Sequence, residues 1–154
     1  AGEKLALEVI RHHRLIELYL IEALGFSWDE VHEQADILEH VISEKLEERI
    51  AAALNYPEFD PHGDPIPAKD GSMARVDVEL LSTVKAGQTV WVRRILDDAN
   101  SELLRYLGDM GLVPGAAVTV QAVAPFEGPL TLLIDEKTQV IGRNVATSVL
   151  VELA

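Results

Sequence analysis

A proline-rich segment in the middle of the chain separates two stretches whose hydrophobic residues recur with different periods. Before it, apolar residues return every three or four positions, as in helices, and after it they alternate, as in strands. The segment itself, residues 55–73, carries four prolines and two glycines and can continue neither a helix nor a central strand. The pattern predicts an α+β fold of two domains, a helical domain over residues 1–72 and a β domain over residues 73–154.

The first stretch predicts three helices. One covers residues 3–23 and stops at Gly25. Ser27, with Glu30 three positions on, forms a capping box that predicts the start of a second helix, and Ser43 caps a third in the same way. Together they make a compact three-helix unit with apolar surface to spare.

The second stretch predicts five or six short strands and one helix. A helix is expected at about residues 101–110, where Gly111 follows as a stop. So many short strands in under eighty residues suit a small barrel, because closing a sheet removes its exposed edges. The expected strands are residues 76–81, 89–95, 117–124, 130–134 and 138–141, followed by SVLVEL at the C-terminus.

Composition excludes several classes of function. The net charge of −13 has the wrong sign for direct contact with a nucleic-acid backbone. The chain has no cysteine, so any metal site must use nitrogen and oxygen ligands, and disulfides and thiol catalysis are excluded. No apolar run approaches the length of a membrane span. We expect a soluble, cytoplasmic protein.

The strongest chemical pattern is a polar stripe in the second predicted helix. His32, Asp36, Glu39 and His40 would project within an arc of roughly 100°. His13 and Glu17 repeat the four-residue spacing on the first helix, so that two helices could present ligands to one space. Imidazole with carboxylate suits manganese, iron(II), zinc, cobalt or nickel.

Other histidines have plainer interpretations. His12 would point about 100° away from His13 around the helix axis, so we expect it to pack inside the protein or to face a partner. His62 lies among turn-forming residues and reads as part of a turn. Two alternatives to metal sensing stay open at this point. Carboxylate-bridged metals would permit a dinuclear metal-dependent hydrolase, and a purely structural dimerisation module would need no metal.

Three motifs in order resemble the diphtheria toxin repressor family of metal-dependent transcriptional regulators. They are H-R-L-x-E from His13, V-H-x-x-A-x-x-x-E-H from Val31, and P-H-G-x-P-I-P from Pro61. The second half resembles the family's SH3-like, FeoA-type domain through L-x-x-M-G-L-x-P-G-x-x-V, from Leu107 to Val118. The resemblance implies the metal-sensing and dimerising portion of a repressor. The winged-helix domain that reads operator DNA has no counterpart in this sequence, and we expect it to be absent from the chain.

The resemblance also implies a ligand set. His13, Glu17 and His32 match the helical ligands of the family's ancillary site. Asp36, Glu39 and His40 match the primary, regulatory site, whose other ligands come from the winged-helix segment. In the β domain the family's acid and amide ligands fall near Asn100 and Leu103, so Asp98 or Glu102 would have to substitute for them.

The same resemblance implies the metal and the partners. The iron-responsive branch commonly has cysteine at the position of Asp36, and the manganese-responsive branch has a carboxylate. We expect Mn²⁺, with Fe²⁺ as the alternative. We expect a homodimer that reaches operator DNA only through the winged helix. Its interface would use the surplus apolar surface of the last two helices: Leu38, Ile42, Leu46 and Ile50.

Overall fold

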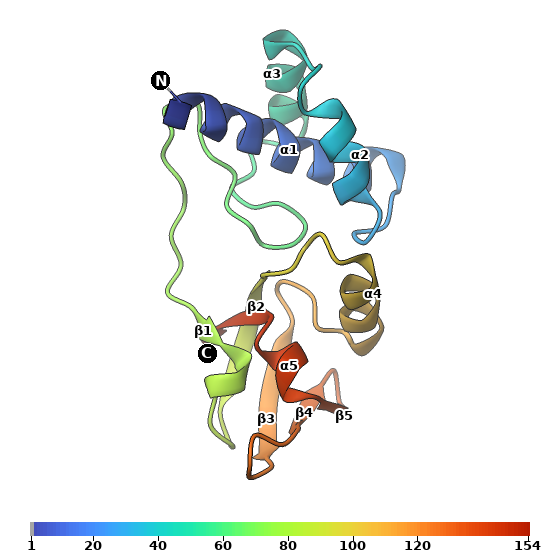
Figure 1. Cartoon of the computed structure of the whole chain (residues 1–154), viewed down its shortest axis with the longest axis vertical. Coiled ribbons are helices and arrows are strands. Elements are labelled where there is room, and N and C mark those ends of the chain that lie inside the picture. The colour runs from blue at the N-terminus through green and yellow to red at the C-terminus, as the bar shows by residue number, and fades with distance from the viewer. Residues whose placement is uncertain (1) are drawn as a thin grey trace. The chain divides into compact units, whose positions relative to one another are not determined.

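The computed structural model describes residues 2–154, which divide into two compact units between Arg75 and Val76. The first unit is helical and the second is built on an antiparallel sheet (Figure 1). The predicted α+β fold class is therefore confirmed. None of the helices within residues 2–154 has the length and apolar character needed to cross a membrane.

The first unit contains α1 (Gly2–Leu24), α2 (Val31–Leu38) and α3 (Glu44–Ala53), and Figure 1 shows α1 running beside the other two. α1 ends before Gly25, whose φ of 73° lies in the left-handed region that favours glycine. The hydroxyl of Ser43 accepts a hydrogen bond from the Leu46 amide and caps α3 as predicted.

α2 is shorter at both ends than the sequence pattern predicts. Ser27 does not cap it. A turn intervenes, in which the Ser27 amide bonds the Glu30 carboxylate at 3.4 Å, and the helix begins at Val31. The helix stops at Leu38, and a turn over residues 39–41 leads to Ser43, which is extended and caps α3. Glu39 and His40 therefore lie in the turn that follows α2, and the predicted polar stripe ends before them.

Two small cores hold the helices together, and α1 contributes neighbouring residues to both. Leu15 packs with Ile50 and Ala51 of α3, whereas Ile16 packs with Val31 and Ala35 of α2. Successive positions on a helix point about 100° apart, so one helix can face two partners. Full burial of each such side chain contributes about 1.5–3 kcal/mol.

The proline-rich segment is a structured loop that folds back on α1. An isolated bridge pairs Phe59 with Pro65. The guanidinium of Arg14 donates to the carbonyl of Pro65, and that of Arg11 donates to the carbonyl of Pro67. These bonds fix the loop beside the middle of α1.

The second unit is a six-stranded antiparallel sheet in the order β1-β6-β2-β3-β4-β5. Alternate residues of β4, Leu130, Leu132 and Ile134, are buried, as the period of two predicts. The helix at residues 101–110 is confirmed as α4, and one further turn of helix, α5, precedes the last strand. The bounds are β1 (Glu79–Leu80), η1 (Leu81–Thr83), β2 (Thr89–Ile95), α4 (Ser101–Met110), β3 (Ala117–Val123), β4 (Leu130–Ile134), β5 (Lys137–Ile141), α5 (Arg143–Ala146) and β6 (Val149–Leu153).

Candidate metal centre

The crossing of α1 and α2 brings together the side chains of His13, Glu17 and His32. Nε2 of His13 lies 3.2 Å from Nδ1 of His32 and 3.5 Å from Oε1 of Glu17. Nδ1 of His32 lies 3.7 Å from Oε2 of Glu17. The Glu17 residue is only 1% exposed. A buried carboxylate flanked by two imidazoles is a donor set that suits a divalent transition metal.

Asp36 lies at the rim of the same group. Its two carboxylate oxygens are 3.4 Å from Nδ1 of His13 and 3.6 Å from Nε2 of His32. Its side chain is 56% exposed, so this carboxylate faces both the histidines and solvent. The ancillary and regulatory ligand sets implied by the family resemblance are thus contiguous in this structure.

Glu39 connects the turn after α2 to α1. Oε2 of Glu39 accepts a 2.6 Å hydrogen bond from Nδ1 of His13, and Oε1 lies 3.2 Å from Nε2 of the exposed His40. Burial alone would lower the pKa of His13, but hydrogen bonds and charges from Glu17 and Glu39 outweigh it and raise the pKa to about 9. The carboxylates of this centre therefore attract a positive charge, which a proton on His13 supplies in the metal-free protein.

A second buried group also lies beside Glu17. His62 is fully buried, and its Nδ1 lies 3.6 Å from Oε2 of Glu17. Its Nε2 lies 2.7 Å from the carbonyl oxygen of Trp28. A carbonyl only accepts, so Nε2 is the donor and the lone pair of the neutral ring is on Nδ1, toward Glu17. Metal-binding histidines commonly show this arrangement, with the other ring nitrogen donating to a backbone carbonyl.

Two aspartates of the loop complete the second group. Oδ1 of Asp60 accepts from the amides of His62 and Asp64, both at 2.9 Å, and its other oxygen makes no hydrogen bond. Ligand atoms of Asp60, His62 and Asp64 lie within 4.8 Å of one another. Burial, followed by the charges of Asp64 and Glu17, raises the pKa of Asp60 well above its ordinary value.

Three buried atoms at this point have no hydrogen-bond partner: Oε2 of Glu17, Oδ2 of Asp60 and Nδ1 of His62. All three are acceptors in their unprotonated forms, and leaving buried acceptors unsatisfied costs about 1–3 kcal/mol each. A divalent cation would satisfy such acceptors, and ligand atoms of Asp60 and His62 lie close enough to share one. The residues present therefore fit a metal ion held by nitrogen and oxygen donors.

The sequence pattern had placed His62 in a turn and had assigned no role to Asp60 or Asp64. The available signal was the alternation of acid and imidazole in D-P-H-G-D, from Asp60 to Asp64. The two ligands considered in the β domain lie in the second unit. Asp98 is half-buried after β2, and Glu102 is exposed in the first turn of α4.

Each half of the chain matches a family model. Residues 1–68 match the iron dependent repressor, metal binding and dimerisation domain, and residues 80–153 match the FeoA domain.

Curated relatives and solved structures extend this similarity over the whole chain. The iron-dependent repressor IdeR of Mycobacterium leprae is 33% identical over 162 residues, which cover 98% of this chain and 70% of that protein. The diphtheria toxin repressor of Corynebacterium glutamicum is 30% identical over 88% of this chain and 65% of its own.

Among solved structures, a manganese-dependent transcriptional repressor in complex with manganese superimposes with a TM-score of 0.94. It is 38% identical, over 99% of this chain and 73% of its own. The manganese regulator SloR gives a TM-score of 0.83 at 31% identity, over 99% of this chain and 70% of its own. The chain belongs to the iron-dependent, or diphtheria toxin, repressor family of metal-dependent transcriptional regulators.

Proposed function

We propose that this chain senses Mn²⁺ and forms the dimer core of a metal-dependent transcriptional repressor, with Fe²⁺ as the alternative metal. One observation carries the proposal. The buried carboxylate of Glu17 lies between two histidines of the helices and one histidine of the loop, with an oxygen that no hydrogen bond satisfies. A cation bound among these nitrogens would satisfy that oxygen and offset the cost of burying the carboxylate.

The proposed ligands fall into three sets. His13, Glu17 and His32 form the ancillary site, and Asp36, Glu39 and His40 belong to the regulatory site. Asp60 and His62 form a third set, and Oε2 of Glu17 lies near both His32 and His62, so this carboxylate could contribute to both neighbouring sets. Asp98 and Glu102 remain candidates from the second unit.

Manganese is favoured by the hard donors. Asp36 supplies oxygen, and the absence of cysteine from the sequence removes the sulfur ligands that favour softer metals. Similar structures include a repressor in complex with manganese and the repressor ScaR with bound Cd²⁺ or Zn²⁺. Geometry and metal availability, more than intrinsic affinity, would therefore select manganese.

Regulation follows from the charges at the centre. A bound cation supplies the positive charge that offsets repulsion among Glu17, Asp36 and Glu39. With that repulsion removed, the side chains hold α1, α2 and the loop in one arrangement, which biases the dimer toward the geometry that fits DNA half-sites. We place this activity in the cytoplasm, where a bacterial-type repressor meets DNA, and propose no catalytic role.

Dimerisation would use the exposed apolar residues at the end of α2 and the start of α3. Of the four residues expected from the sequence, Leu46 is 47% exposed. Leu38 and Ile42 pack partly within the unit, and Ile50 is buried in its own core. We therefore propose that Ile37 and Val41, both strongly exposed, join Leu46 in the interface.

Calorimetric titration with Mn²⁺ tests the function through Glu17. Glu17→Gln should abolish at least one equivalent of bound Mn²⁺ and lower the affinity of the remainder. Glu22→Gln, which removes the same charge from an exposed position of α1, should bind like the wild type. An anomalous-scattering map of crystals grown with manganese would identify the ligands directly. Equal stoichiometry and affinity in the two variants, or turnover of phosphoesters that depends on Mn²⁺, would contradict the proposal.

A further inference from the structure

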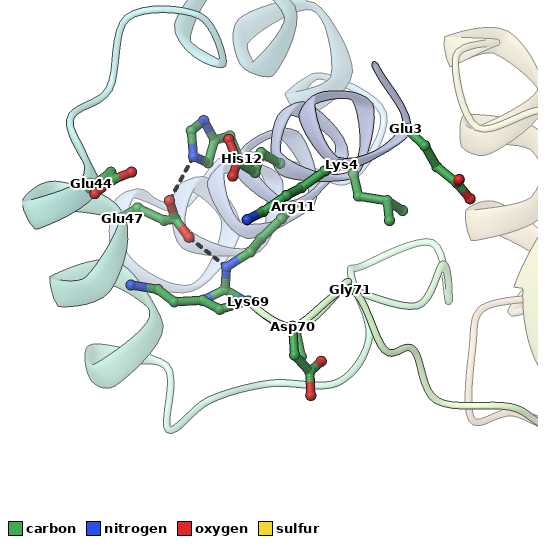
Figure 2. Close-up of a pocket in the computed structure, with 12 residues that line it drawn as sticks. Glu3, Lys4, Arg11, His12, Glu44, Glu47, Lys69, Asp70 and Gly71 are labelled. Atoms are coloured by element: carbon green, nitrogen blue, oxygen red, sulfur yellow. Dashed lines mark hydrogen bonds and ion pairs between the residues drawn. The ribbon is translucent and has the colours of Figure 1, made fainter. Parts of the chain in front are cut away.

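His12 contacts both ends of the connection between α2 and α3. Its Nδ1 lies 3.1 Å from the backbone carbonyl oxygen of Glu39, and its Nε2 lies 2.6 Å from Oε2 of Glu47. Figure 2 shows the His12 ring directed at the Glu47 carboxylate. Both partners are acceptors, so each ring nitrogen faces a group to which its N–H can donate. One imidazole of α1 thus links the turn after α2 to the first turn of α3.

Glu47 is itself firmly held. It is buried, and its second oxygen accepts a 2.5 Å hydrogen bond from Nε of Arg11, as Figure 2 also shows. Another nitrogen of Arg11 donates to the carbonyl of Pro67. Charge-assisted bonds of this kind are roughly twice as strong as neutral ones. The Glu47 carboxylate therefore has a fixed position from which it can orient the His12 ring.

The His12 contact matters because Glu39 lies just beyond the regular part of α2. Its amide still bonds the carbonyl of Ala35, but its own carbonyl faces His12. His13, the next residue along α1, binds the carboxylate of the same Glu39. Two consecutive residues of α1 thus hold the backbone and the side chain of one proposed metal ligand.

We propose that His12 and Glu47 are positioning residues of the metal centre. Glu47 orients the His12 ring, whose Nδ1–H fixes the Glu39 carbonyl and through it the place of the Glu39 carboxylate. The inference rests on the proposed metal-sensing function and deepens it. It adds a connection, through His12, from α3, the helix that borders the proposed dimer surface, to a ligand that lies outside α3.

The contact between His12 and Glu47 could instead stabilise the fold without any effect on the metal ligand Glu39. Two variants of His12 distinguish these two roles. The amide nitrogen of asparagine takes the place of Nδ1, and that of glutamine takes the place of Nε2. His12→Asn therefore keeps the donor to the Glu39 carbonyl and loses the contact with Glu47. His12→Gln keeps the contact with Glu47 and loses the donor to Glu39.

The experiment measures Mn²⁺ dissociation constants by calorimetry and the urea midpoint of unfolding in the presence of a chelator. His12→Gln should weaken Mn²⁺ binding about tenfold, the lower end of the range for residues that orient metal ligands. His12→Asn should weaken Mn²⁺ binding less than His12→Gln does, because it keeps the donor to the Glu39 carbonyl and loses only the contact with Glu47 that orients it. It should nevertheless be the less stable of the two, because it leaves one contact of the buried Glu47 unmade. Affinity and stability should therefore rank the two variants in opposite orders.

Glu47→Gln tests the positioning role of Glu47 independently, and Glu48→Gln is its matched control. Glu48 is the next residue of α3 but faces Tyr56 and Lys69 instead of His12. We expect weaker Mn²⁺ binding only in Glu47→Gln. The inference is overturned if His12→Gln and Glu47→Gln bind like the wild type while Glu39→Gln loses binding, or if affinity follows stability in both His12 variants. Absence of Mn²⁺ binding by the wild type would overturn the proposed function together with this inference.

Discussion

Nδ1 of His13 lies 2.6 Å from Oε2 of Glu39, and this hydrogen bond joins a side chain in the middle of α1 to a side chain in the turn after α2. The two residues belong to different proposed sites, the ancillary and the regulatory one. Nε2 of His13 faces Glu17 and His32, which leaves Nδ1–H to orient Glu39. This hydrogen bond therefore couples a ligand of the ancillary site directly to a ligand of the regulatory site.

The metal-free protein should lose stability as the pH rises. The pKa of His13 is raised from 6.5 to about 9, because Glu17 and Glu39 outweigh the effect of burial. A raised pKa in the folded state contributes stability that is complete below pH 6.5 and is lost as the pH passes through about 9. Urea unfolding between pH 6 and 9.5 in the presence of a chelator checks this.

The control for this pH dependence is Glu39→Gln, which removes one of the two carboxylates that raise the pKa of His13. Its stability should fall less steeply with pH than that of the wild type. The raised pKa of Asp60 acts in the same direction and should remain in the variant. Stability that is constant or rises between pH 6.5 and 9 would contradict the assignment.

Asp60→Asn should stabilise the metal-free protein and weaken metal binding. The asparagine oxygen can still accept from the amides of His62 and Asp64, while the carboxyl group that is costly to ionise is removed. We expect a gain of about 1–3 kcal/mol in the free energy of unfolding with chelator present, and a smaller increase in melting temperature on addition of Mn²⁺.

His62→Gln is the companion to that variant. Its amide can replace Nε2 as donor to the Trp28 carbonyl, but it has no lone pair at the position of Nδ1. It should retain the fold and bind less Mn²⁺. If either variant binds Mn²⁺ like the wild type, the loop group is not a metal site.

Asp36→Cys should change the preference among metals more than the overall fold. The side chain is largely exposed, so substitution costs little packing. Sulfur favours softer ions, and the ratio of Zn²⁺ to Mn²⁺ affinity should rise by about tenfold or more. Competition titrations with a chromophoric chelator measure this ratio, with Asp36→Asn separating the loss of charge from the gain of sulfur.

Val41→Glu should weaken self-association without unfolding the protomer. Val41 is 73% exposed in the turn before α3, whereas neighbouring Ile42 packs partly inside the unit. A charge placed in an apolar interface is left unpaired on association and disfavours it by several kcal/mol. Sedimentation equilibrium reports the oligomeric state, and Glu33→Gln, on the exposed surface of α2, is the control. An unchanged association constant would exclude this face from the dimer.

The sequence predicts elements well wherever one period persists. The ranges of β2 and β4 agree with their predicted strands, because alternation decides the exposed and buried faces without help from distant residues. The end of α2 is less predictable. Glu39 and His40 continue the helical stripe in sequence, and no glycine or proline there marks the turn that the structure places at residues 39–41.

The loop group shows what local pattern cannot provide. His62 resembles a turn residue because its neighbours are turn formers, yet it is fully buried. Its burial depends on a loop that Arg11 and Arg14 hold against α1, about fifty positions away in sequence. When distant contacts determine the burial of a side chain, the residues next to it in sequence do not predict that burial.

Exposure across the centre increases steadily, from Glu17 and His62 in the interior through His32 to Asp36 at the rim. We expect an ion at the exposed rim to exchange with solvent faster than an ion at the buried carboxylate of Glu17. The centre would then respond on two timescales. A brief rise in metal concentration would occupy only the outer ligands, and a sustained one would fill the interior and persist after the external concentration falls.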